Sequence, residues 1–344
     1  MAYFHPSSMK QNSVGHILLL APHSLARAAM SLPALAGVVG RYPELKVTVV
    51  APFGQRALYE PFAGVEFVAI DEPQYGGLRG AVRLAAMLRK SGVAAVVSLE
   101  KGFRLRLLAL LLRGERVRLR RPSGETRPLT RKYRKTLAPI TPYTERVKGL
   151  FEAVGLPAEA VVMNECGAEG CASSVVDILL GEKCCPWIGL SLLTPNHGTC
   201  YPLPKAARLI ELLAARDCKV VLFGADGYER QFAEGMQSLY ENVVSVAGRL
   251  PLEEQLNLLT RLDTLVCVDN NLLRLAALKG TRTVALWGAT HPYLDPLFTA
   301  EGAVVDMQCK MACRPCSTDG RRNCLFGHYK CMNSLTPDEI CSNI

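Results

Sequence analysis

The chain has 344 residues, 49% of them hydrophobic, and its mean hydropathy is only +0.14. These values indicate a soluble globular protein that is long enough for two domains, each with its own core. No apolar run reaches the length of a membrane-spanning helix, and residues 1–14 lack the long apolar segment of a signal peptide. We therefore expect a cytoplasmic protein whose thiols are mostly reduced.

The net charge of +9 comes from one segment of the chain. Residues 101–135 contain thirteen basic and two acidic residues, whereas the rest of the chain contains 27 basic and 29 acidic residues. Such a tract favours a polyanionic partner: a phosphorylated glycolipid, an anionic membrane surface or nucleic acid. Its only aromatic residues are Phe103 and Tyr133, which is poor for base stacking, so we do not expect nucleic acid. A solvated charged face is the structural alternative.

The N-terminal half alternates strand-like and helix-like segments. Strands are predicted at 16–21, 46–51, 65–70 and 93–99, and amphipathic helices at Leu25–Val39 and Leu78–Lys90. This alternation predicts a parallel sheet with helices on both faces. Residues 113–142 are basic, weakly periodic and rich in Pro, Thr and Gly, and we expect a long functional loop there.

The C-terminal half repeats the alternation after a predicted helix at 143–154 and an irregular stretch at 155–186. Strands are predicted at 187–193, 219–223, 243–246, 264–268 and 283–287, and helices at 204–216, 228–240, 252–261 and 272–279. The expected fold class is α/β, with two Rossmann-like domains that face each other across a cleft. We place these domains at 1–170 and 171–344, with the boundary inside the irregular stretch.

The most informative segment is 264–291, which predicts a strand, a short polar turn, a helix and a second strand. Asp269, Asn270 and Asn271 follow the first strand, and Gly288 to Thr290 follow the second. In open parallel sheets ligands bind beyond the carboxyl ends of the strands, and a helix N-terminus there favours an anion. The segment therefore predicts a ligand site, although any Rossmann-like domain contains such a unit.

Five segments carry a specific signal through their order and spacing. They are ILLLAPHSLARAAMSLPAL (17–35), VVLFGADGYE (220–229), AGRLPLEEQLNLLTRLDTLVCVD (247–269), ALWGATHP (285–292) and CRPCSTDGRRNCLFGHYKCMNSLTPDEI (313–340). Together they resemble the heptosyltransferases of glycosyltransferase family 9 over nearly the whole chain. The resemblance implies a GT-B fold and a cytoplasmic enzyme without a cofactor or metal. Such an enzyme transfers heptose from ADP-heptose, with inversion, to a lipid A-core acceptor of lipopolysaccharide.

The resemblance places the donor site in the C-terminal domain, where a sugar nucleotide needs an anion site and groups that bind hydroxyls. The structural alternatives are that Asp269 is a helix cap and that Glu229 is a first-turn helix charge. We expect Asp269→Ala to weaken nucleotide binding with little effect on thermal stability. The donor-binding candidates are Thr194, Thr199, Gly224, Glu229, Asp269, Asn270, Asn271, Arg274 and Gly288.

The chain departs from the family at several functional positions. The acid of the family's first turn, its expected general base, falls on Arg27, which cannot accept a proton near neutral pH. The family's phosphate-neutralising Lys falls on Thr199. The Ser, Gly and His of its Asp-Ser-Gly-x-x-His run fall on Asn270, Asn271 and Arg274.

Two interpretations of these departures stay open. Arg274 supplies the charge that Thr199 lacks, because guanidinium binds phosphate well, and His23 or His197 serves as the base. Alternatively, the chain is a catalytically silent homologue that binds sugar nucleotide or glycolipid and serves a partner protein. With Arg27 in the base position, we expect the chain to bind the donor measurably but to transfer its sugar slowly or not at all.

The acceptor side of the site is expected in the basic tract. Arg118, Arg120 and Arg121 are its candidate contacts to a phosphorylated core acceptor or an anionic membrane surface. The protein would then be peripheral on the inner face of the inner membrane.

Five of the thirteen cysteines cluster near the C-terminus, beginning with Cys309. Cys313, Cys316, Cys324 and Cys331, with His328 nearby, are enough for a tetrahedral zinc or iron site. Their gaps of two, seven and six residues are irregular for a zinc ribbon. We therefore expect reduced, partly buried thiols, and any metal bound there would be structural.

Overall fold

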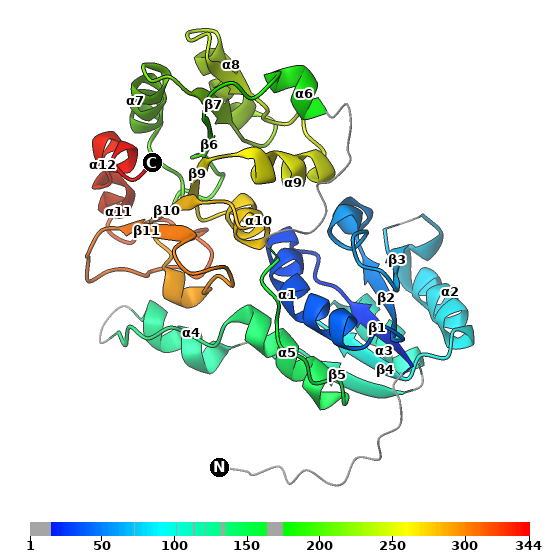
Figure 1. The fold of residues 1–344 in the computed structure, drawn as a ribbon. Helices are drawn as coiled ribbons and strands as arrows, with labels where there is room; N and C mark the ends of the chain where they lie inside the picture. Colours follow the sequence, from blue (N-terminus) through cyan, green and yellow to red (C-terminus); the bar gives the residue numbers. More distant parts are fainter. Residues whose placement is uncertain are drawn as a thin grey trace. The chain divides into compact units, whose positions relative to one another are not determined.

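The structure is a computed structural model, and it describes residues 15–71, 73–100, 102–112, 114–120, 122–131, 135–163 and 175–344. These residues form two compact units. The first contains the described residues before 122 together with 143–161, and the second contains 122–142 and the residues from 162 onward. Each unit is built around one parallel sheet (Figure 1).

The sheet of the first unit has the order β3-β2-β1-β4-β5, and all its pairs are parallel. Leu18 of β1 lies opposite Thr48 of β2 and Val96 of β4. Because β1 is central, all five of its residues are buried. The strands are β1 (His16–Leu20), β2 (Lys46–Ala51), β3 (Val65–Ala69), β4 (Ala95–Ser98) and β5 (Glu115–Arg118).

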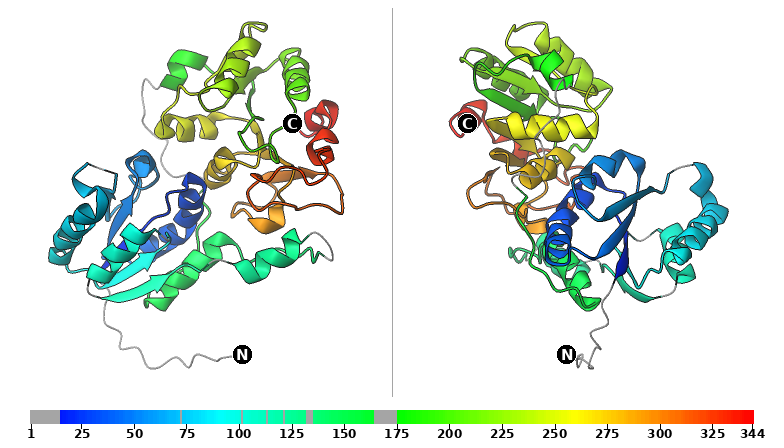
Figure 2. Two further views of the ribbon diagram at one scale, coloured as in Figure 1. Left: turned by 180° about the vertical axis from the view of Figure 1, so that it is seen from behind. Right: turned by 45° about the vertical axis from the view of Figure 1, so that its right-hand side comes forward.

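Helices cover both faces of this sheet (Figure 2). On one face, α2 and α3 bury a cluster that includes Leu18, Leu84 and Leu108. On the other face α1 packs against α5, and the Thr144 hydroxyl donates to the carbonyl of Met30 at 2.8 Å. The helices are α1 (Leu25–Arg41), α2 (Gly77–Lys90), α3 (Phe103–Leu111) and α5 (Tyr143–Ala153), with 3-10 segments η1 (Phe53–Leu58) and η2 (Pro73–Tyr75).

The sheet of the second unit has the order β11-β10-β9-β6-β7-β8 and is also entirely parallel. Its strands are β6 (Trp187–Ser191), β7 (Lys219–Leu222), β8 (Val243–Ser245), β9 (Thr264–Val268), β10 (Thr283–Trp287) and β11 (Val304–Gln308). The four central strands are almost wholly buried, as the apolar runs in the sequence indicate.

The helices of the second unit include the C-terminal residues, since α12 packs on α7. The helices are α4 (Ser123–Thr130), α6 (Val175–Leu180), α7 (Leu203–Ala214), α8 (Tyr228–Gln237), α9 (Leu252–Arg261), α10 (Asn271–Lys279), α11 (Lys330–Asn333) and α12 (Pro337–Cys341), with the 3-10 segment η3 (Pro292–Leu294). Within the described ranges, none of the helices has the length and apolar character needed to span a bilayer.

The predicted α/β class with two parallel sheets is confirmed, and the predicted strands and helices lie close to the observed ones. The expectation of a long loop at 113–142 is wrong, because this segment contains β5 and α4. β5 is an edge strand whose residues are largely exposed, so its sequence carries no apolar run. The predicted domain boundary at 170/171 falls within 164–174, outside the described residues.

Candidate functional site

Four loops gather at the carboxyl edge of the second sheet. They follow β10, β9, β6 and β7, which are consecutive neighbours in this parallel sheet. Ligands of open α/β sheets bind at this edge. The loops carry the predicted donor-side residues Thr194, Thr199, Gly224, Asp269, Asn270 and Gly288, whereas Glu229 lies on the first turn of α8 and Asn271 and Arg274 lie on α10.

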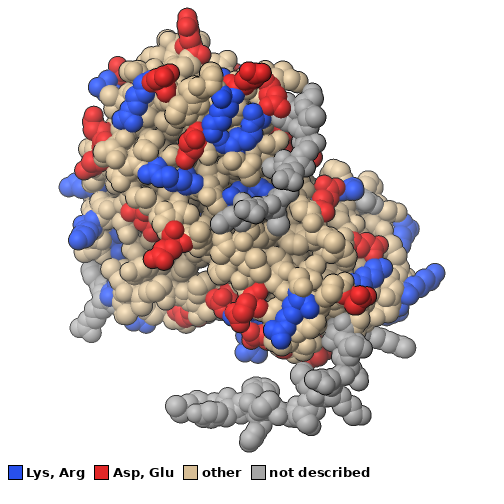
Figure 3. Space-filling view, in the orientation of Figure 1, with Lys and Arg blue, Asp and Glu red and all other residues tan. Residues whose placement is uncertain are grey.

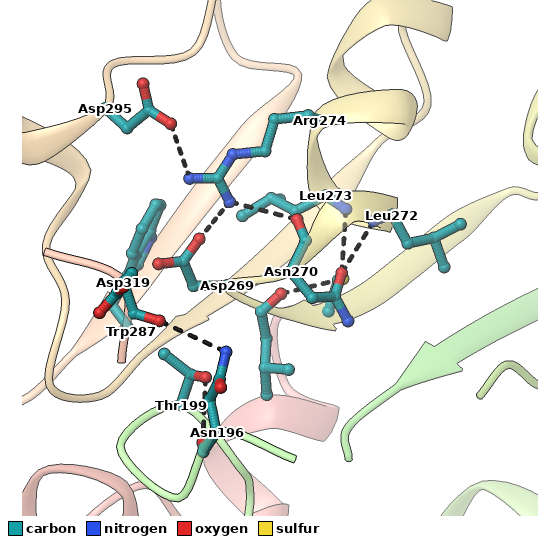
Figure 4. A network of polar contacts seen from close by, with 12 residues as sticks. Asn196, Thr199, Asp269, Asn270, Leu272, Leu273, Arg274, Trp287, Asp295 and Asp319 are labelled. Carbon is teal, nitrogen blue, oxygen red and sulfur yellow. Dashed lines mark hydrogen bonds and ion pairs between the residues drawn. The ribbon is translucent and has the colours of Figure 1, made fainter. Parts of the chain in front are cut away.

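An ion triad centred on the buried Arg274 lies beside the end of β9, and its third member, Asp295, is 37% exposed (Figure 4). The Arg274 guanidinium is only 6% exposed and pairs through Nη1 with the carboxylate of Asp269, which is 11% exposed. Its Nη2 lies 3.2 Å from Oδ2 of Asp295, and Nη1 also donates to the carbonyl of Asn270 at 3.3 Å. The guanidinium carbon lies 5.8 Å from the centre of the Trp287 ring.

This triad determines what Arg274 can do. Burial alone would lower the pKa of the guanidinium, but the Asp269 and Asp295 carboxylates outweigh that effect and raise it. The side chain is therefore a permanent cation whose charge is matched by two acids. Arg274 is thus engaged in compensating Asp269, and its Nη atoms are already used within the protein.

Asn270 is the N-cap of α10. Its Oδ1 accepts from the backbone N–H groups of Leu272 at 2.9 Å and Leu273 at 3.3 Å, and its Nδ2 donates to Ser191 Oγ at 2.8 Å. Two of the amides that a helix N-terminus could offer to a phosphate are therefore already bonded. The neighbouring Asn271 side chain is exposed.

Thr199 lies in a packed junction between loops. Its side chain is fully buried, and its hydroxyl donates to the carbonyl of Asn196 at 3.2 Å. The carbonyl of the adjacent Gly198 accepts from Ala289 N–H at 2.7 Å. A Cβ at Gly288 would lie 2.4 Å from that same carbonyl, so only glycine fits at this position.

Glu229 turns back onto its own loop. The carboxylate is 7% exposed, and its Oε2 accepts from Ala225 N–H at 2.9 Å. Burial raises the pKa of Glu229, although the hydrogen bond from Ala225 acts in the opposite direction. The adjacent Tyr228 hydroxyl donates to the carbonyl of Thr194 at 2.7 Å, which joins the loops after β6 and β7. An open cavity of about 490 Å³ borders these two loops, and its lining includes Thr194, His197, Tyr228 and Tyr329.

In the first unit, His23 lies at the carboxyl edge of the sheet, between β1 and α1. Its backbone N–H donates to Glu100 Oε2 at 3.1 Å, and its Nδ1 lies 3.5 Å from the same oxygen. Glu100 follows β4, the neighbour of β1. Buried Gln55 donates to the carbonyls of Pro22 and His23, each at 2.9 Å. The His23 ring is therefore held beside a carboxylate and remains 59% exposed.

The other predicted residues of this edge are exposed. Arg27 lies on the first turn of α1, so it shares the edge with His23. Arg118 ends β5, and Arg120 follows it. Arg121 lies outside the described residues.

Within the described part of the chain, no three His, Cys, Asp or Glu side chains are grouped so that they could hold a metal ion. Cys313, Cys316, Cys324 and Cys331 line a small cavity of about 20 Å³. Burial raises the pKa of Cys316, and it raises that of Cys331 to about 11, so both are thiols at neutral pH. All four are free cysteines.

Buried Arg314 connects this tail to the loop after β10. It donates to the carbonyls of Gly288 and Cys309, each at 2.5 Å, and of Thr290 at 3.1 Å. The sequence analysis did not identify Arg314, because nothing in its local pattern distinguishes it from other arginines. Glu100 and Asp295 were missed for the same reason, since their roles depend on contacts between distant segments.

Known proteins resemble this chain in sequence and in fold. Residues 180–330 match the model of glycosyltransferase family 9 (heptosyltransferase). Lipooligosaccharide heptosyltransferase 2 of Haemophilus influenzae is 29% identical over 109 residues, which cover 30% of this chain and 32% of that protein. The match therefore spans about a third of the length of this curated relative.

Two solved structures share the fold. A glycosyl transferase family 9 structure from Veillonella parvula superposes with a TM-score of 0.75 at 15% identity and covers 98% of both chains. The E. coli heptosyltransferase WaaC with ADP-2-deoxy-2-fluoro heptose gives a TM-score of 0.64 at 17% identity, covering 95% of this chain and 98% of that one.

The two parallel sheets thus define an α/β protein of the GT-B type. Residues 180–330, somewhat under half of the chain, are similar to glycosyltransferase family 9 (heptosyltransferase), and the shared fold extends over nearly the whole chain.

The triad changes what we expect of Asp269→Ala. Removing one partner of a buried ion pair costs about 3–5 kcal/mol, and Asp295 remains to limit the loss. We therefore expect a clear fall in the free energy of unfolding, measured by denaturant titration, as well as weaker nucleotide binding. The double variant Asp269→Ala/Arg274→Met should recover most of the stability. Glu211→Ala, which breaks an exposed pair with Arg208, is the matched control and should cost less than about 1 kcal/mol. A stable single variant would contradict the triad's structural role.

Asn270→Ala should free the first amides of α10. We expect a loss of about 1 kcal/mol of stability from the missing cap, together with tighter binding of ADP by isothermal titration calorimetry. Thr336→Ala removes the N-cap of α12 and is the matched control: it should lose similar stability without changing ADP affinity. Unchanged or weaker ADP binding in Asn270→Ala would show that the capped amides are not part of an anion site.

His291 should make stability depend on pH. Burial lowers its pKa to about 4, helped by nearby Arg314, and its Nδ1 accepts from Tyr293 N–H at 3.1 Å. The unfolded value is about 6.5, so this contribution is present above that pH and is lost as the pH falls toward 4. His291→Asn, which keeps an acceptor, should show a smaller drop in Tm between pH 7 and pH 4.5 by calorimetry. Parallel pH profiles for parent and variant would refute the assignment.

Proposed function

We propose that the chain is a heptosyltransferase-like glycosyltransferase. It transfers a sugar from ADP-heptose, or a related sugar nucleotide, to a phosphorylated lipid A-core acceptor on the inner face of the inner membrane. The family model matches most of the second unit, and a family member of the same fold has been solved with an ADP-heptose analogue. The observation that carries the proposal is the pairing of His23 with Glu100, which supplies a base beside the position that Arg27 occupies.

The chemistry needs a proton acceptor for the attacking hydroxyl. The acceptor oxygen forms a bond to the anomeric carbon, the bond from that carbon to the diphosphate breaks, and ADP leaves with the electron pair. With Nδ1 turned toward Glu100, the Nε2 atom of His23 is left to take the hydroxyl proton. Glu100 stabilises the imidazolium that results, as a carboxylate does for the histidine of a hydrolase triad.

The two units carry different parts of this function. In the second unit, Asp269 and Glu229 are proposed to accept hydrogen bonds from donor hydroxyls, and the amides at the carboxyl edge to face the diphosphate. In the first unit, Arg118 and Arg120 are exposed at the edge that carries His23, and are proposed to bind acceptor phosphates. Direct displacement at the anomeric carbon, the step proposed here, inverts the configuration of that carbon.

A second candidate function is a silent homologue that binds sugar nucleotide or glycolipid for a partner. Two observations favour it. The Asn270 side chain already bonds two backbone N–H groups of α10, and Arg274 already pairs with Asp269 and Asp295. Both features reduce what the second unit offers to stabilise the charge of a leaving diphosphate, so they lower catalysis more than binding. ADP binding without turnover would identify this function.

ADP release from ADP-heptose in the presence of acceptor glycolipid separates these functions. We expect His23→Ala to lower kcat by about 10²-fold or more, because general-base help contributes about 10²–10⁴-fold. Glu100→Gln should lower kcat less than His23→Ala does while leaving KM for the donor unchanged, which a merely structural role would not do. His328→Ala, a histidine of the C-terminal tail, is the matched control and should keep the parent rate.

Arg27→Asp tests the replaced base position directly. If the site has drifted from the family's chemistry, an acid at 27 should raise turnover. The opposite result is that turnover is unchanged in His23→Ala and falls in Arg27→Asp. It would show that Arg27 is functional and that His23 is not the base. Absence of both ADP binding and turnover in the parent would reject both candidate functions.

A further inference from the structure

The outward faces of α2 and α3 combine basic and large apolar side chains. Neither helix contains an acidic residue. The exposed basic residues are Arg79, Arg83, Arg89 and Lys90 on α2 and Arg106 on α3. The large apolar side chains Leu78, Val82, Met87, Phe103 and Leu110 are between 40% and 71% exposed. We call these ten residues the α2–α3 face.

The face is one continuous surface rather than ten scattered side chains. The Nε of Arg89 donates to the carbonyl of Leu111 at 2.7 Å, which ties the C-terminal ends of the two helices together. Leu78, Val82 and Arg89 lie on one stripe of α2, because Val82 and Arg89 follow Leu78 by four and eleven residues. Since Arg89 contacts Leu111, this stripe borders α3. The opposite side of α2 is buried in the core of the first unit.

The outer side of α3 repeats the same composition. Phe103, Arg106 and Leu110 are spaced by three and four residues, which puts them on one side of the helix. Leu105 and Leu108 are buried on the other side. In Figure 3, Lys and Arg side chains project from the edge of the molecule where Figure 1 shows α2.

We propose that the α2–α3 face docks the protein on an anionic membrane surface. Cationic side chains bind the head groups while apolar ones enter the boundary between head groups and acyl chains, which is how amphipathic helices bind membranes in the interface plane. The charge argues for this occupant: a second copy placed on the face would bring two groups of cations together. A nucleic acid would leave Leu78, Val82 and Leu110 without an apolar partner.

This inference rests on the proposed function, because a lipid-anchored acceptor lies in such a membrane. The α2–α3 face is distinct from Arg118 and Arg120, which are proposed to bind the phosphates of the acceptor. The two can therefore be separated by experiment.

The test is sedimentation of the full chain with vesicles of phosphatidylethanolamine and phosphatidylglycerol, compared with phosphatidylcholine vesicles. We expect the parent to bind the anionic vesicles at least tenfold more tightly, and this binding to weaken with salt. The variant Arg79→Ser/Arg83→Ser/Lys90→Ser should lose at least tenfold in binding. Phe103→Ser/Leu110→Ser should also bind more weakly but keep its salt dependence.

Matched controls come from the second unit and from the acceptor contacts. Ile178→Ser/Leu239→Ser removes two equally exposed apolar side chains, and Lys310→Ser/Arg322→Ser removes two exposed cations; both should bind vesicles like the parent. Arg118→Ser/Arg120→Ser should also leave vesicle binding within about twofold. Thermal unfolding confirms that each variant is folded.

Three outcomes would overturn the inference. They are equal binding to both kinds of vesicle, vesicle binding unchanged in both α2–α3 variants, and loss of a dimer in light scattering that accounts for the weaker binding. Transfer to a soluble core oligosaccharide without lipid distinguishes this failure from failure of the proposed function. The α2–α3 variants should keep the parent rate in that assay, whereas His23→Ala should not.

Discussion

A buried guanidinium between two carboxylates organises the carboxyl edge of the second sheet. Arg274 reaches Asp269 at the end of β9 and Asp295 beyond β10, so it joins neighbouring strands through charge. Neither the Arg274 guanidinium nor the Asp269 carboxylate would be stable there without its partner, because burying an unpaired charge costs several kcal/mol. The loop after β9 is therefore held in one conformation, and Asn270 is held there as the cap of α10.

The same triad explains how an arginine can be accommodated at position 274. The resemblance aligns Arg274 with a histidine, and the permanent charge of arginine requires permanent compensation, which the two acids provide. Asp269 thereby becomes part of the framework as well as a candidate ligand group. In the first unit the corresponding change is Arg27, and there a carboxylate and an imidazole are instead brought together from separate strands. In both units, charged side chains from separate segments therefore meet at the carboxyl edge of the sheet.

The sequence could predict the strands and most of the helices because their apolar periods are strong. It could also predict which loops share an edge, since parallel strands leave no other arrangement. It could not predict β5, whose exposed edge position removes the apolar signal. Nor could it show that Asn270 caps α10 or that Glu100 faces His23 from 77 residues away, because these roles arise from contacts made only after folding.

Arg314 has an electrostatic consequence. Its guanidinium donates to the carbonyl oxygens of Gly288, Thr290 and Cys309. Carbonyl dipoles solvate a cation without cancelling its charge, so a net positive potential remains in a region of low dielectric constant. That potential acts on the loop after β10, whose Ala289 N–H bonds the carbonyl of Gly198. The C-terminal tail therefore places a fixed positive charge close to Gly198, the neighbour of Thr199, on which the resemblance places the family's lysine.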